Sequence, residues 1–63
     1  MSTSEIKNAL LNGQILGNEA AGWETLCNPS AKVYCILRED GDIFFSNIDG
    51  LAKRVSKYIK NGI

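Results

Sequence analysis

The fold is decided by residues 32–46, which read KVYCILREDGDIFFS. Two runs rich in β-branched and aromatic residues flank an acidic turn in this stretch, and Asp-Gly between two apolar runs is a strong short-range signal for a β-hairpin. We therefore expect strands at Lys32–Arg38 and Ile43–Ser46, joined by a two-residue loop at Asp40-Gly41.

The hairpin predicts a sheet that is apolar on both faces. A two-residue loop pairs Arg38 with Ile43, Leu37 with Phe44 and Ile36 with Phe45. Because side chains alternate along a strand, one face then holds Val33, Cys35, Leu37 and Phe44. The other face holds Tyr34, Ile36, Ile43 and Phe45, with Arg38 beside them.

Two helices on one side of such a sheet cover only one of its faces, which leaves the other as a candidate interface. We expect the Leu37/Phe44 face to be the core, because the Tyr34 hydroxyl can face water or a partner. The predicted partner-binding residues are Tyr34, Ile36, Ile43, Phe45 and Arg38. Two arrangements would remove this interface: a helix on each face, or residues 13–22 folding with Trp23 over the second face.

The two ends of the chain predict helices. Ser2 and Glu5 have the spacing of a capping box, and apolar residues follow at helical spacing, so we expect a helix over Ser4–Asn12, or one that continues to Gly17. A second helix, capped by Ser46 or Asn47, should run to Asn61-Gly62. Its predicted apolar stripe is Ile48, Leu51, Ala52, Val55 and Ile59.

Between the first helix and the hairpin, the chain predicts a loop at Gly17–Gly22 and an ambiguous short strand at Trp23–Cys27. Trp23 is expected to be a core anchor. The predicted fold class is a single α+β domain over residues 1–63, with a small antiparallel sheet of two or three strands flanked by the two helices in the order α-β-β-β-α. A chain of this length buries too little surface for two cores.

Composition argues against catalysis. The chain has 63 residues, no histidine and two cysteines, Cys27 and Cys35, which we expect to be free thiols. Without histidine there is no imidazole base and no histidine ligand for a metal. The acidic residues Glu39, Asp40 and Asp42 sit on an exposed turn, where nothing would exclude water from a reaction. We expect no enzyme activity, cofactor, metal or small-molecule substrate.

Charge is unevenly distributed although the formal net charge is zero. All four charged residues of the last helix are basic, and they define an alternative site for nucleic acid at Lys53, Arg54, Lys57 and Lys60, where binding would be weak and salt-dependent. The sequence has no signal peptide and no membrane-length apolar run, which favours a cytoplasmic protein. The leading hypothesis is a small non-catalytic protein-interaction module, acting as an inhibitor, adaptor or homodimer through an apolar sheet face.

Overall fold

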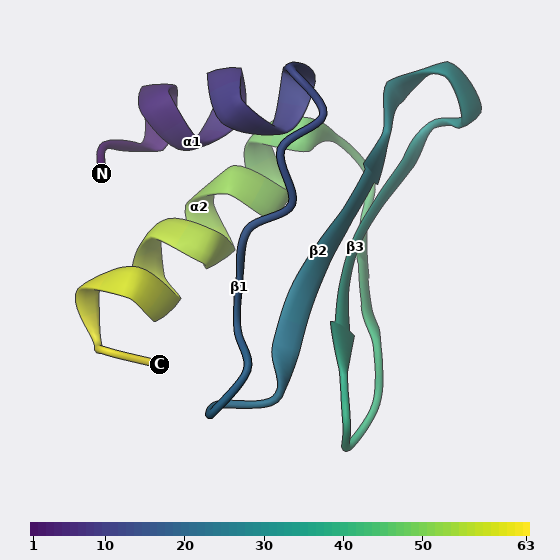
Figure 1. Ribbon diagram of the computed structural model, residues 1–63. Coiled ribbons are helices and arrows are strands. Elements are labelled where there is room, and N and C mark those ends of the chain that lie inside the picture. The colour runs from purple at the N-terminus through teal and green to yellow at the C-terminus, as the bar shows by residue number, and fades with distance from the viewer.

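The chain forms one antiparallel sheet with both helices on the same side of it (Figure 1). A computed structural model describes residues 1–63. The strands lie in the order β1-β2-β3-β4 across the sheet. The elements are α1 Thr3–Leu11, β1 Gly17–Asn18, β2 Trp23–Asn28, a 3-10 turn at Pro29–Ala31, β3 Val33–Arg38, β4 Ile43–Phe45 and α2 Ile48–Lys60.

The predicted α+β class is confirmed, and the sheet has four strands where two or three were expected. The ambiguous segment is a full strand, β2, which pairs along its length with β3. Part of the predicted Gly17–Gly22 loop is the two-residue strand β1, in which Gly17 pairs with Glu24 and Asn18 with Trp23. So short a strand has no apolar alternation, and the sequence therefore gave no sign of it.

The predicted hairpin forms with a register shifted by two residues. Ile36 pairs with Ile43, and Tyr34 pairs with Phe45. The turn is wider than two residues because the Asp42 carboxylate accepts the Arg38 backbone N–H at 3.1 Å, in place of a strand carbonyl. A shift of two residues keeps each side chain on its own face, so the predicted grouping into faces is correct.

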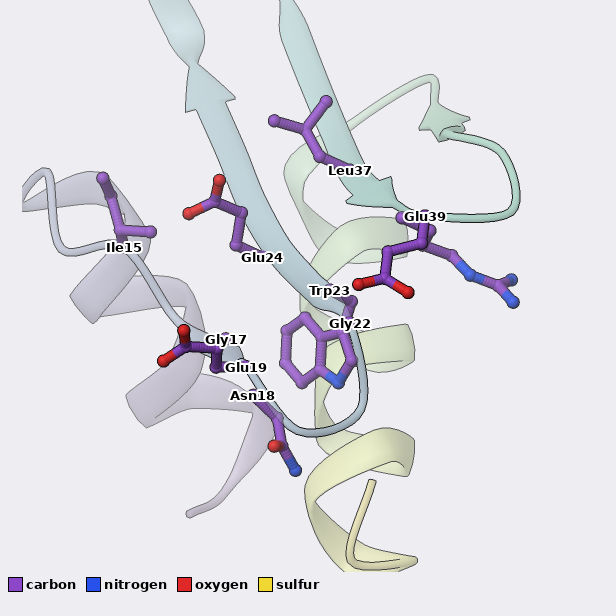
Figure 2. Close-up of a pocket in the computed structure, with 10 residues that line it drawn as sticks. Ile15, Gly17, Asn18, Glu19, Gly22, Trp23, Glu24, Leu37 and Glu39 are labelled. Atoms are coloured by element: carbon purple, nitrogen blue, oxygen red, sulfur yellow. The ribbon is translucent and has the colours of Figure 1, made fainter.

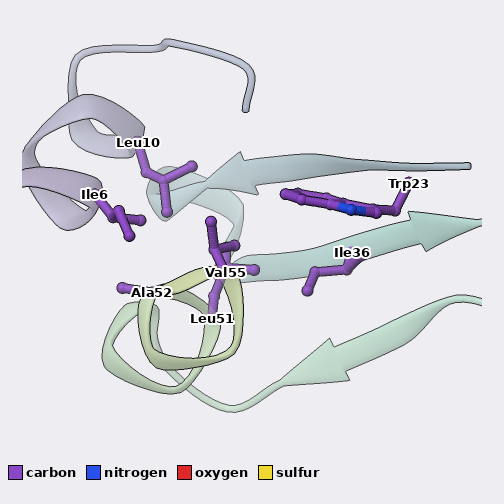
Figure 3. Packing of buried hydrophobic residues seen from close by; sticks show 7 residues of the cluster. All are labelled: Ile6, Leu10, Trp23, Ile36, Leu51, Ala52 and Val55. Atoms are coloured by element: carbon purple, nitrogen blue, oxygen red, sulfur yellow. The ribbon is translucent and has the colours of Figure 1, made fainter. Parts of the chain in front are cut away.

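The core lies between the sheet and the helices, with Ile36 of β3 fully buried within it (Figure 3). Helix α1 packs against α2, and α2 in turn packs against β3 and β4. The cluster comprises Ile6, Leu10, Trp23, Ile36, Leu51, Ala52 and Val55. The predicted stripe of α2 is thus largely confirmed, although Ile59 at its far end is 38% exposed and Tyr58 packs on the core in its place.

The expected choice of inner face is wrong. Ile36 is 0% exposed, whereas Phe44 on the face expected inside is 70% exposed. The reason lies in β2, which places Trp23 and Thr25 on the Ile36 face. Its Glu24 lies on the Phe44 face, and covering that face with helices would bury a carboxylate that has no cationic partner.

Local polar contacts define the helix ends. The Ser2 N–H donates to Glu5 Oε1 at 3.0 Å and the Glu5 N–H donates to Ser2 Oγ at 3.1 Å, which confirms the capping box. Helix α1 ends at Leu11 and does not continue to Gly17. The Asn47 side chain caps α2 by accepting the Gly50 N–H at 2.9 Å.

A pH dependence follows from two carboxylates. The Ser2 backbone N–H lowers the pKa of Glu5, and the hydrogen bond and charge of Lys7, whose Nζ lies 2.8 Å from Asp49 Oδ1, lower the pKa of Asp49. A carboxyl with a pKa lower in the folded than in the unfolded chain stabilises the fold above its unfolded pKa, and this contribution disappears as the pH falls through the folded pKa.

We therefore expect Asp49→Asn to be slightly less stable than the wild type in urea denaturation at pH 7. The difference should vanish at pH 2, where Asp49 is protonated in both states of the wild type. An equal loss of stability at both pH values would contradict this account and assign the effect of the substitution to packing.

The inner face is tested by comparing two apolar positions. Ile36→Ala should destabilise the fold by about 2–5 kcal/mol, and Ile36→Val by about 0.5–1.5 kcal/mol if the alanine variant does not fold. Phe44→Ala removes a larger side chain from an exposed site and should have a smaller effect than Ile36→Val. Urea denaturation monitored by circular dichroism measures all three, and the opposite ranking would refute the observed face assignment.

Candidate protein interface on the outer sheet face

The sheet face opposite the helices carries a group of apolar side chains. We call this the outer face and define it by Leu26 of β2, Val33 and Leu37 of β3 and Phe44 of β4. Leu26 is 45% exposed and Phe44 is 70% exposed, while Val33 and Leu37 are half-buried. An exposed aromatic ring beside aliphatic side chains is the composition found at protein-binding surfaces.

Cys35 lies in the middle of the outer face and is nevertheless buried. Leu26 and Phe44 are its partners on the two neighbouring strands, so their side chains lie beside the small thiol on the same face. Burial raises the pKa of the Cys35 thiol, and the negative charge of Asp42 raises it further. Neighbouring side chains of the outer face therefore cover the Cys35 thiol and keep it from solvent.

Both cysteines are free, as predicted. Cys27 pairs with Tyr34 and packs against the core on the inner face, whereas Cys35 belongs to the outer face. The sheet itself separates the two thiols, so they cannot form a disulfide with each other. Burial also raises the pKa of Cys27.

An acidic hollow adjoins the outer face at one end of the sheet (Figure 2). Its volume is about 660 Å³, and its lining includes Ile15, Leu37 and the exposed side chains of Glu19, Glu24 and Glu39. None of the three glutamates forms an ion pair, because the two ion pairs of the chain are Lys7–Asp49 and Arg38–Asp40. We define this acidic hollow by those five residues.

Close backbone contacts position the walls of the hollow. The Glu39 N–H donates to the Gly22 carbonyl at 3.3 Å, which joins the turn after β3 to the turn before β2. Gly22 has a φ of 76°, and a Cβ there would lie 3.0 Å from the Glu39 side chain. At Gly17 a Cβ would lie 2.7 Å from the Trp23 carbonyl oxygen, so only glycine allows β1 to approach β2 so closely.

The residues predicted to bind a partner are not brought together at the surface. Ile36 is in the core, Tyr34 and Phe45 pack against it, and Ile43 is half-buried on the same inner face. The guanidinium of Arg38 is held by Asp40, with Nη2 2.9 Å from Oδ2.

Leu26 was not predicted from the sequence as a surface residue, although the alternation of residues along β2 indicates its position. Trp23, Thr25 and Cys27 alternate with Glu24 and Leu26. Once Trp23 is taken as a core anchor, this alternation sends Leu26 to the opposite face, where it joins Phe44.

The four basic residues of α2 lie in two different environments. Lys53, Lys57 and Lys60 are exposed and form no ion pair. Arg54 is half-buried, with its guanidinium carbon 5.5 Å from the centre of the Phe45 ring, a cation–π contact. The alternative nucleic-acid site therefore has three free cations, and Arg54 already stabilises the packing of α2 on β4.

Trp23 is a core anchor, as predicted. Its ring makes a T-shaped contact with Tyr58 of α2, with ring centres 5.2 Å apart, and its indole N–H has no hydrogen-bond acceptor. Thr25 holds the preceding loop, because its hydroxyl donates to the Leu16 carbonyl at 3.1 Å and accepts the Leu16 N–H at 2.9 Å.

No cluster of three or more carboxylate or thiol side chains is arranged to hold a metal ion. Neither helix is both long enough and apolar enough to span a bilayer. The chain matches none of the protein-family models, curated proteins or solved structures with which it was compared.

The cover over Cys35 is testable with a thiol reagent. In a Cys27→Ala background, native Cys35 should react slowly, since it is buried and its pKa is raised. Phe44→Ala should increase the reaction rate several-fold by uncovering the thiol. Ile15→Ala is the matched control, because Ile15 is equally exposed, at 69%, and lies outside the outer face. Equal rates in all three proteins would show that Phe44 does not shield Cys35.

Proposed function

We propose that this chain is a non-catalytic protein-binding module and that its contact surface is the outer face. The observation that supports this most directly is Phe44, 70% exposed on a sheet face that no helix covers. Phe44 lies beside Cys35 and helps to cover its thiol, yet most of the Phe44 side chain stays exposed, and exposed apolar surface of this kind is suited to contact with a partner.

The composition of the outer face supports this role. Its strands present an aromatic ring and aliphatic side chains above a rigid, hydrogen-bonded sheet, so that a partner docks without ordering a flexible loop. Aromatic residues near the centre of such surfaces commonly carry much of the binding energy. Leu26 and Phe44 flank Cys35 from opposite sides and are the most exposed side chains of the outer face.

The chemistry of the chain is consistent with binding in place of catalysis. Both thiols have raised pKa values, so little thiolate forms at neutral pH. The chain contains no histidine to act as their base. The absence of catalysis remains part of the proposal.

Nucleic-acid binding through α2 is the second candidate function. It is favoured by the three lysines Lys53, Lys57 and Lys60, which are exposed and unpaired. Lysines at this spacing lie along one side of the helix and could follow a line of phosphates. Three cations give weaker binding than the six to ten phosphate contacts typical of strong, salt-sensitive DNA binding.

The proposed function is tested by affinity capture from a lysate of the source organism, followed by binding measurements with the purified captured protein. Phe44→Asp and Leu26→Asp should each weaken binding roughly thirtyfold or more, the loss typical of a central interface residue. Circular dichroism would confirm that both variants fold.

Two control variants separate the alternatives. Leu11→Asp places a carboxylate on an exposed apolar residue of α1, at 52% exposure, and should leave binding unchanged. The double variant Lys53→Glu, Lys57→Glu should also bind normally. If instead only the lysine variant loses binding, and the captured ligand is nucleic acid, the proposed function is wrong and the second candidate is correct.

A further inference from the structure

The acidic hollow is continuous with the outer face. Leu37 of β3 belongs to both, and Glu24 on β2 lies directly across from it in the sheet register. In Figure 2 the carboxylates of Glu19, Glu24 and Glu39 come from three separate segments around the hollow. A partner that covers Phe44 and Leu26 therefore reaches these carboxylates within the same contact.

We infer that the partner of the outer face is a basic protein surface, and that the acidic hollow receives an arginine or lysine side chain from it. This inference rests on the proposed function and adds the chemical nature of the partner. Its basis is charge complementarity between that surface and three carboxylates that no cation of this chain neutralises.

The charges disfavour an acidic or neutral occupant. Docking removes water from Glu19, Glu24 and Glu39, and this loss of hydration is unfavourable unless cationic groups replace the water. Arg38, the cation of this chain that lines the hollow, has its guanidinium 2.9 Å from Asp40. Nucleic acid would bring phosphates to the same carboxylates and would be repelled.

A second copy of this chain is also a poor fit for the outer face. Two copies docked through this face would each bring their own Glu24 and Glu39. The connection between β2 and β3 adds a single cation, Lys32. A basic surface on another protein would offer these carboxylates more cationic partners than a second copy of this chain does.

The shape of the hollow suits a long cationic side chain. Ile15 and Leu37 provide apolar surface, and each of the three glutamates that line the hollow provides a separate carboxylate acceptor. Arginine and lysine place an apolar stem against such surface while their charged group binds carboxylates. Either cation can bind one of the exposed carboxylates, and arginine can do so with two parallel hydrogen bonds to the same carboxylate.

The test compares two peptides by NMR titration of the ¹⁵N-labelled protein. One is acetyl-Leu-Arg-Leu-amide, and the other has citrulline in place of arginine, with nearly the same shape and no charge. The arginine peptide should shift the amide signals of Gly17, Gly22 and Glu24 and bind at least about tenfold more tightly than the citrulline peptide, as expected for hydrogen bonds to charged groups.

Variants of the glutamates complete the test. The double variant Glu24→Gln, Glu39→Gln should abolish the preference for arginine, whereas Glu5→Gln, on α1, should preserve it. Raising the salt concentration should weaken the binding of the arginine peptide, because exposed charges are screened. Equal binding of the two peptides, or shifts confined to other residues, would overturn the inference.

The outcomes distinguish this inference from the proposed function. If arginine has no advantage while Phe44→Asp still abolishes partner capture, the inference of a basic partner is wrong and the proposed function stands. If capture does not depend on Phe44, the proposed function itself is wrong. A dimer in analytical ultracentrifugation that Phe44→Asp dissociates and that excludes the arginine peptide would assign the outer face to a second copy and overturn the inference.

Discussion

The structure depends on the burial of Ile36 between the sheet and helix α2. This residue lies on β3, which pairs with β2 on one side and β4 on the other, so its packing against Leu51 and Val55 fixes which face of the sheet meets the helices. Strand geometry then determines every other position, because neighbouring residues point to opposite faces. Val33, Cys35 and Leu37 are directed outward for this reason alone.

One layer of helices over a two-faced sheet leaves a surface for contacts. In a chain of 63 residues, both helices are used on the inner face, and the connections are too short to return over the outer one. On the outer face, Cys35 is consequently covered only by side chains of the sheet itself, and Phe44 remains exposed. Fold stability and the proposed binding function thus have the same origin.

Positive and negative charges are concentrated in different regions of the molecule, although the formal net charge is zero. The turns before β2 and before β4 place carboxylates at one end of the sheet, and the exposed lysines lie on α2. The pairs Lys7–Asp49 and Arg38–Asp40 neutralise charge locally and leave both regions uncompensated. Under the proposed function, this charge distribution would orient a partner before contact, through attraction at one region and repulsion at the other.

The sequence by itself determined the local features: the capping box at Ser2 and Glu5, the Asn47 cap of α2, the hairpin, and the division of its residues into two faces. These depend on contacts within a few residues along the chain, or on the strict alternation of a strand. Only the tertiary structure decided which face is buried, because both faces are apolar within the hairpin and the choice depends on β2, whose Trp23 must be covered and whose Glu24 must stay in water. The same holds for the acidic hollow, since Glu19, Glu24 and Glu39 come to line one end of the sheet only when the strands pair, which no local pattern encodes.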